Sequence, residues 1–194
     1  MWKQMLPGLR MTLFLTVLTG LIYPGLVTAL CQVLFPNQAN GSLITRNGKV
    51  IGSSLIGQNF SKPEYFQPRP SAAGNDGYDA TASGGSNYGP TSQKLIDRVK
   101  GTVQKIKAEN PAAYGALPAD MATTSGSGLD PHVSPESAKL QVARVAQARG
   151  TSAETIAQLV DQFIEQRDLG FLGEARVNVL NINLALDERF PRAR

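Results

Sequence analysis

The chain has 194 residues, of which 42% are hydrophobic and 18% charged, and this balance favours a folded protein over wholesale disorder. The formal net charge is +4, but Lys3 and Arg10 are the only charges before residue 46, so the rest of the chain is nearly balanced. Such a chain lacks the broad basic field of a nucleic-acid-binding protein. One cysteine, Cys31, and one histidine, His132, exclude an intramolecular disulfide and a standard structural zinc site, and no metal site is expected.

The first predicted element is a transmembrane helix over residues 11–35. This run, MTLFLTVLTGLIYPGLVTALCQVLF, carries no charge, and a spanning helix needs about 20 apolar residues. Pro24 is expected to kink it, as membrane helices tolerate. Lys3 and Arg10 precede the run, and no cation follows it until Arg46. The positive-inside rule therefore predicts a cytoplasmic N-terminus, residues 1–10, and an extracytoplasmic domain, residues 36–194.

Two alternatives to a retained anchor remain open. Val27-Thr28-Ala29 offers acceptable residues to a signal peptidase, and cleavage after Ala29 would release a secreted binding module. Apolar residues continue beyond that point to Phe35, which favours retention. The run could also be the core helix of a soluble domain, although 25 uncharged residues would be unusual there.

The outer part begins with a predicted β-hairpin and continues as a long irregular segment. Asn47-Gly48 is a favoured two-residue turn, and β-prone residues flank it on both sides. Residues 61–92 are rich in proline and glycine but keep several aromatic side chains. Since disordered loops are poor in aromatics, we expect this segment to be ordered by packing.

Three helices and a strand are predicted next. Thr91 or Ser92 caps a helix that ends at Asn110-Pro111, and Ser134-Pro135 starts a second that ends before Gly150. Thr151 and Glu154 form a capping box for a third helix, whose apolar face extends to Ile164. Residues 176–187 alternate apolar and polar side chains, which predicts a strand with a bulge near Val179. The expected fold is α+β: one N-terminal transmembrane helix followed by a single mixed α/β domain.

The stretch SGSGLDPHVSP, residues 125–135, holds the residue types of a hydrolytic triad. An anchored envelope hydrolase would use Ser127 as nucleophile and His132 as base. However, a nucleophile elbow has glycine two residues before the serine, and position 125 is serine. The simpler interpretation is a shaped turn in which Asp130 precedes Pro131 and Ser134 caps a helix.

A second dense segment is PEYFQPRPS, residues 63–71. An arginine between two prolines beside aromatic residues suits a rigid contact surface. Tyr65, Phe66 and Arg69 are therefore candidate contacts to a partner. Packing of these residues onto their own domain is an equally open alternative.

Seven short blocks in order carry a resemblance that no one of them would carry alone. They are GSLI (41–44), GSSLIGQNF (52–60), PEYFQPRPSA (63–72), SGGSNYGPT (83–91), TTSGSGLDPHVSP (123–135), QVARVAQAR (141–149) and LGEARVNVLNINLALD (172–187). With the N-terminal helix, they resemble the C subunit of the bacterial Kdp potassium-transporting ATPase over nearly the whole chain. Gln67 and Tyr88 stand where histidine and leucine are the more usual residues.

The resemblance implies a non-catalytic accessory subunit of a potassium uptake pump in the cell inner membrane, with its main domain periplasmic. Its implied partners are a pore-forming potassium-binding subunit, a P-type ATPase subunit and membrane lipid. The family is described as supporting assembly and as raising the ATP affinity of the ATPase subunit, so ATP would be shared and no cofactor bound firmly here. Because ATP is cytoplasmic, this effect would require coupling across the membrane. Family-motif residues that could serve the subunit interface are Ser127, Asp130 and His132.

Overall fold

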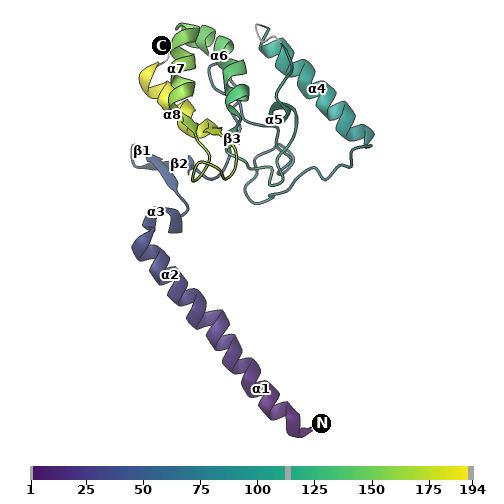
Figure 1. The fold of residues 1–194 in the computed structure, drawn as a ribbon, viewed down its shortest axis with the longest axis vertical. Helices are drawn as coiled ribbons and strands as arrows, with labels where there is room; N and C mark the ends of the chain where they lie inside the picture. Colours follow the sequence, from purple (N-terminus) through teal and green to yellow (C-terminus); the bar gives the residue numbers. More distant parts are fainter. Residues whose placement is uncertain (1, 112–114, 192–194) are drawn as a thin grey trace. The chain divides into compact units, whose positions relative to one another are not determined.

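The computed structural model describes residues 2–111 and 115–191 and divides into two compact units, residues 1–51 and 52–194. The first unit is dominated by one long helix (Figure 1). It comprises α1 (Trp2–Val17), a π-helical turn η1 (Leu18–Ile22) and α2 (Tyr23–Leu34). The predicted helix over 11–35 is therefore present, and it extends further toward the N-terminus than expected.

The long helix is apolar enough to cross a membrane. Residues Lys3–Leu34 form one helix of 32 residues, and none of its most apolar window is buried inside the structure. At 1.5 Å per residue this is roughly 48 Å, more than the hydrocarbon core of a bilayer requires. The hydroxyls of Thr12 and Thr19 donate to the carbonyls of Gly8 and Leu15, so both polar groups are satisfied within the helix.

The helix accommodates Pro24 by a local change of hydrogen bonding. Proline has no N–H and its ring crowds the carbonyl four residues earlier. The turn before it widens to the π form, in which the N–H of Tyr23 donates to the carbonyl of Leu18. The helix ends at Leu34, with Phe35 as its C-cap, and a short helix α3 (Pro36–Ala39) follows.

The predicted hairpin is confirmed by β1 (Leu43–Arg46) and β2 (Lys49–Ser53). Asn47 and Gly48 between them both have positive φ, as a type I′ turn requires. Residues 54–92 then form no helix or strand, which includes the segment 61–92 expected to be irregular, and they precede α4 (Gln93–Glu109), whose N-cap is Ser92. A short helix α5 (Ala119–Ala122) packs against α4.

The core of the second unit lies between three helices and a small antiparallel sheet. The sheet has strand order β3 (His132–Val133), β5 (Arg176–Asn178), β4 (Ile164–Glu165). Helices α6 (Pro135–Arg149), α7 (Ala153–Gln162) and α8 (Val179–Arg189) pack around it (Figure 1). The buried residues include Val145, Ile156, Val160, Val177, Ile182 and Leu186. The predicted α+β fold class is confirmed.

The predicted second helix is confirmed with both its ends. Ser134 accepts a hydrogen bond from the N–H of Ser137, and Gly150 closes α6 in the left-handed conformation. The third helix differs by one residue at its start, because Ser152 rather than Thr151 is the N-cap and accepts from the N–H of Thr155. It also ends at Gln162, so Ile164 lies in β4 instead of on the helix.

The predicted strand over 176–187 is wrong beyond Asn178. Only Arg176–Asn178 is extended, and Val179–Arg189 forms α8. The side chain of Asn178 caps this helix by accepting from the N–H of Asn181. The alternating apolar residues also fit a helix, because Val179, Ile182, Asn183 and Leu186 repeat at spacings of three and four and are all buried.

Candidate functional site

The segment containing Phe66 is held by two buried amide side chains. Asn183 on α8 accepts from the N–H of Phe66 and donates to its carbonyl, both at 2.9 Å. Gln141 on α6 does the same for Gln67, accepting at 2.7 Å and donating at 3.1 Å. Asn183 is 1% exposed and Gln141 0%. Each amide thus makes the pair of hydrogen bonds that a neighbouring β-strand would otherwise make, and it satisfies the backbone N–H and carbonyl of one residue in the loop.

Two arginines hold the start of the same segment. Arg144 donates to the carbonyls of Pro63 and Tyr65 at 2.6 and 3.0 Å. Arg149 has an almost fully buried side chain, pairs with Asp187 at 2.9 Å and donates to the carbonyl of Glu64. The guanidinium of Arg149 also lies 4.9 Å from the ring centroid of Tyr65. These contacts place the segment firmly on α6 and α8.

Phe66 is a core residue of its own domain, as the alternative to a partner contact predicts. Its side chain is 0% exposed and belongs to the main hydrophobic cluster. Tyr65 and Arg69 are also turned to their own domain: the Tyr65 hydroxyl donates to Asp187, and Arg69 pairs with Asp130 at 2.9 Å. Both remain half-buried, so a partner contact by these two stays a prediction.

The glycine-rich turn at residues 125–130 is where three loops meet. Gly84 donates to the carbonyl of Ser127, and Gly57 donates to the carbonyl of Leu129, both at 2.8 Å. Gly128 has φ +68, and a Cβ there would lie 2.6 Å from the carbonyl oxygen of Gly84 and 2.8 Å from the nitrogen of Ala73. Only glycine fits this position, because the backbone is left-handed there and two other backbone segments of the same chain approach closely.

The turn also begins a row of alternating basic and acidic side chains. Arg69 pairs with Asp130, whose other oxygen lies 3.6 Å from Nδ1 of His132. Nε2 of His132 lies 3.6 Å from Glu165, which accepts a hydrogen bond from Arg176 at 3.1 Å. The sheet register produces this row, because His132 and Glu165 lie on the two strands that flank β5.

Ser127 and His132 are not brought together as a nucleophile and base. The hydroxyl of Ser127 accepts from the N–H of Leu129 at 3.1 Å and lies 3.4 Å from the hydroxyl of Ser125. His132 faces Asp130 and Glu165 instead. Within the described residues, the geometry thus supports the shaped-turn interpretation of SGSGLDPHVSP, since a triad needs direct contact between its members.

Asp130 gives this region a dependence on pH. Burial raises the pKa of its carboxyl, but hydrogen bonds from His132 and the charge of Arg69 outweigh burial, and the pKa lies below its ordinary value. A carboxyl whose pKa is lower in the folded state adds stability above its unfolded pKa, near 4, and loses it as the pH falls through the folded value. The substitution Asp130→Asn removes this carboxyl, and with it the part of the pH dependence of stability that the carboxyl supplies.

We therefore expect Asp130→Asn to unfold at a lower temperature than the wild type at pH 7 and to show a smaller further decrease between about pH 5 and pH 3. Thermal unfolding of the full chain in detergent, followed by near-ultraviolet circular dichroism, measures both. An unchanged acid dependence would mean that Asp130 does not carry this effect.

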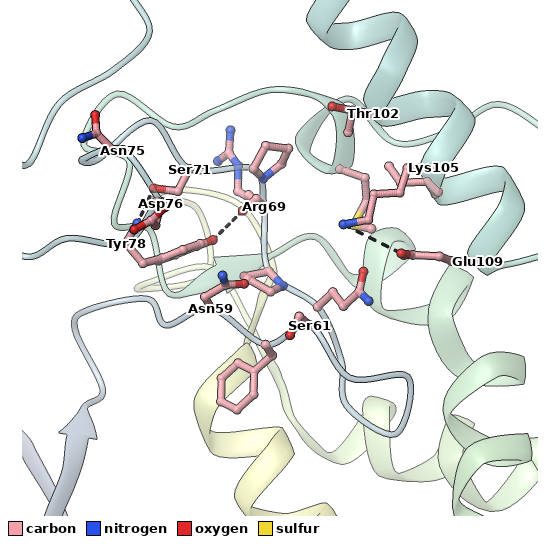
Figure 2. A pocket seen from close by; sticks show the side chains of 17 residues that line it. Asn59, Ser61, Arg69, Ser71, Asn75, Asp76, Tyr78, Thr102, Lys105 and Glu109 are labelled. Carbon is pink, nitrogen blue, oxygen red and sulfur yellow. Dashed lines mark hydrogen bonds and ion pairs between the residues drawn. The ribbon is translucent and has the colours of Figure 1, made fainter.

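A pocket of about 310 Å³ lies between the 59–78 segment and α4 and α5 (Figure 2). Charged side chains in its lining are Arg69, Asp76, Lys105 and Glu109, so their charges cancel. The Tyr78 hydroxyl in its wall donates to the carbonyl of Arg69, and burial raises the pKa of this phenol. The remaining lining is half polar, with Asn59, Ser61, Gln67, Ser71, Asn75 and Thr102, and half non-polar, with Phe60, Pro68, Pro70, Gly77, Ile106 and Met121.

Two of the lining residues each have a buried polar atom without a hydrogen-bond partner among the described residues, Nε of Arg69 and Oε2 of Glu109. Such a lining can hold a neutral polar group that both donates and accepts hydrogen bonds. Neither Ser127 nor His132 lines it. In the part of the chain that the structure describes, no group of three or more histidine, cysteine, aspartate or glutamate residues could hold a metal ion.

Nothing in the sequence indicated several of the residues that hold the 63–71 segment and the 125–135 turn in place. Asn183 and Gln141 lie in helices far along the chain from the backbone they pair with, and Glu165 reaches His132 only through the sheet. Of the predicted site residues, Arg69, Asp130 and His132 come together, while Tyr65 and Phe66 pack toward α6 and α8.

Comparison with known proteins gives a consistent result. The family described as K+-transporting ATPase, c chain, matches residues 5–188. The chain is 56% identical over 193 residues to the potassium-transporting ATPase KdpC subunit of Rhodospirillum rubrum, which covers 100% of both chains. It is 58% identical over 187 residues to that of Gemmatimonas aurantiaca, covering 96% of this chain and 94% of the relative. That of Myxococcus xanthus is 54% identical over 191 residues, covering 98% and 90%.

A long apolar helix that buries none of its most apolar window, joined to a separate compact unit, fits a membrane-anchored protein. The match over nearly the whole length makes the assignment specific. The chain belongs to the KdpC family, the c chain of the K+-transporting ATPase.

Proposed function

We propose that the chain is a non-catalytic accessory subunit of a potassium-transporting ATPase, held in the inner membrane by one helix. The single observation that carries this proposal, beside family membership, is the helix Lys3–Leu34, which buries none of its apolar window on its own chain. A helix of this kind needs lipid or other membrane helices around it. The helix supplies the tether, and the second unit supplies the surface that meets the pump.

The proposed orientation places the N-terminus in the cytoplasm and the second unit in the periplasm. Lys3 and Arg10 lie near the N-terminal end of the helix, and Arg46 is the first cation beyond the other end. Positive charge is retained on the cytoplasmic side of membrane helices. The partners in this arrangement are the pore-forming potassium-binding subunit and the P-type ATPase subunit.

An effect on ATP affinity would then be indirect. With the second unit outside and ATP inside, any change in ATP binding is a coupling free energy transmitted through the membrane subunits. ATP would be bound by the ATPase subunit, with no firm site on this chain. Comparing ATP dissociation constants of the pump with and without this chain measures that coupling.

The orientation gives a direct test. In a Cys31→Ser background, Asp76→Cys is expected to react in intact cells with a reagent that cannot cross the inner membrane, because Asp76 is exposed on the second unit. Gln4→Cys, which is exposed near the N-terminus, is the matched control and is expected to react only after the membrane is opened. Labelling of Gln4→Cys alone in intact cells would reverse the orientation.

The accessory role is tested by purification. A tag on this chain is expected to recover the pump subunits from solubilised membranes, and potassium-stimulated ATP hydrolysis is expected to fall when the chain is omitted. Recovery of the chain alone, with unchanged pump activity in its absence, would contradict the proposal. Mass spectrometry of the same material is expected to find residues 1–29 intact; a mature N-terminus at Leu30 would favour the cleaved alternative.

A further inference from the structure

The connection between β4 and β5 ends in a closed turn, residues 168–172, that we call the apolar loop. The backbones of Asp168 and Leu172 exchange two hydrogen bonds of 2.9 Å, and the N–H of Gly170 donates to the carbonyl of Arg167 at 3.0 Å. These bonds give the turn a defined shape. Yet its side chains face solvent: Leu169 is 83% exposed and Phe171 69%.

Leu169 also has an unfavourable backbone conformation. Its φ is +53, followed by Gly170 at +82. Left-handed backbone is rare for a bulky residue, and glycine or asparagine occupies it at lower cost. A leucine at this position is therefore unfavourable both for the backbone and for solvation. Strained residues of this kind concentrate at sites that bind something, where a contact outside the folded chain offsets the cost.

The charges around the loop are paired with one another. Arg167 pairs with Glu174 at 2.5 Å across its base, and Arg176 pairs with Asp168 at 3.3 Å and Glu165 at 3.1 Å. Residues 165–176 therefore hold two arginines against three carboxylates. A segment that binds a lipid surface usually carries an excess of lysine or arginine beside its apolar side chains. This loop has a slight negative excess instead, which favours a protein pocket over lipid.

We propose that the apolar loop is a docking anchor whose Leu169 and Phe171 side chains insert into an apolar pocket on another subunit of the pump. The proposal rests on the proposed function and adds the element that makes the contact. Two apolar side chains on a turn of defined shape lose little entropy on binding, and paired charges around them can exclude water from such a contact. The tether keeps the local concentration high, so a small contact is sufficient.

The first experiment replaces the apolar side chains without disturbing the turn. A full-length tagged chain that carries both Leu169→Asn and Phe171→Asn is expected to recover at least tenfold less of the pump subunits. The unfolding temperature of the purified chain is expected to stay the same or rise, because asparagine tolerates the left-handed backbone. The matched control, Leu169→Met with Phe171→Leu, keeps the apolar character and is expected to retain the complex.

The outcomes separate this inference from the proposed function. If the wild-type chain recovers the pump and the asparagine variant does so equally, the anchor is excluded while the accessory role stands. If the wild-type chain recovers no pump subunit, the proposed function itself fails. If the asparagine variant unfolds at a clearly lower temperature, the loop stabilises its own domain and the anchor is likewise overturned.

The second experiment distinguishes a protein pocket from lipid. Phe171→Trp in a Trp2→Phe background places the chain's single tryptophan in the loop. Its emission is expected to shift to shorter wavelength when pump subunits are added, and to be equal in detergent and in a lipid nanodisc that contains this chain alone. A shift in the nanodisc without pump subunits would show that the loop enters lipid, and no shift in the complete complex would show that it stays in water.

Discussion

Gly128→Ala is expected to be the most damaging small substitution in the second unit. The added Cβ would lie 2.6 Å from the carbonyl oxygen of Gly84 and 2.8 Å from the nitrogen of Ala73, and neither backbone can move alone. A left-handed alanine costs about 1–2 kcal/mol, and overpacking adds typically 1–3 kcal/mol. The free energy of unfolding is therefore expected to fall by about 2–5 kcal/mol, which lowers the unfolding temperature by roughly 5–20 °C.

Gly126→Ala is the matched control two residues earlier in the same turn. Nothing lies within 4 Å of a Cβ at Gly126, and its φ is not positive. This variant is expected to change the free energy of unfolding by less than about 1 kcal/mol. Thermal unfolding of both full-length variants in detergent, followed by near-ultraviolet circular dichroism, makes the comparison. Equal effects of the two alanines would mean that the three loops do not meet as closely at Gly128 as described.

Asn183→Leu is expected to have an effect of similar size. Leucine keeps the branching and the number of heavy atoms of asparagine, although its methyl groups are bulkier, but it leaves the N–H and carbonyl of Phe66 without the two hydrogen bonds that Asn183 supplies. An unsatisfied buried backbone group costs about 1–3 kcal/mol, so the free energy of unfolding is expected to fall by about 2–6 kcal/mol. Denaturant unfolding of the full chain in detergent measures this difference.

Asn181→Leu provides the control on the same helix, since Asn181 is only partly buried. We expect it to cost less than about 1 kcal/mol. The effect of Asn183→Leu is also expected to extend beyond α8, because the segment released from it leads directly to Arg69. If the two leucine variants unfold alike, the pairing of Asn183 with Phe66 is not what holds the segment in place.

Features specified by neighbouring residues were predicted from the sequence. Ser134 and Gly150 delimit α6 as expected, and Asn47-Gly48 forms the hairpin turn. In each case the signal and its consequence lie within a few residues of one another. The observed N-cap of α7 is one residue later than predicted. Both Thr151 and Ser152 can supply a capping oxygen, and the sequence alone does not decide between them.

The helix α8 shows where pattern alone is insufficient. Leu180, Ile182, Leu184 and Leu186 alternate as in a strand, while Val179, Ile182, Asn183 and Leu186 repeat as in a helix. The same residues therefore fit both the two-residue period of a strand and the 3.6-residue period of a helix. Packing of α8 against β5 and the hydrophobic core selects the helix, and the helix places Asn183 against the backbone of Phe66. That partner lies 117 residues earlier and gives no local sign.

The sequence by itself determined the apolar helix, the turns and caps, and the family. These depend on composition over a short window or on the order of motifs, and both are visible in one dimension. Only the tertiary structure decided that Phe66 belongs to the core, that His132 faces Asp130 and Glu165 instead of Ser127, and that Leu169 lies exposed in a strained turn. The physical reason is that burial and pairing are set by residues brought together from distant parts of the chain, and their free energy appears only when those parts pack.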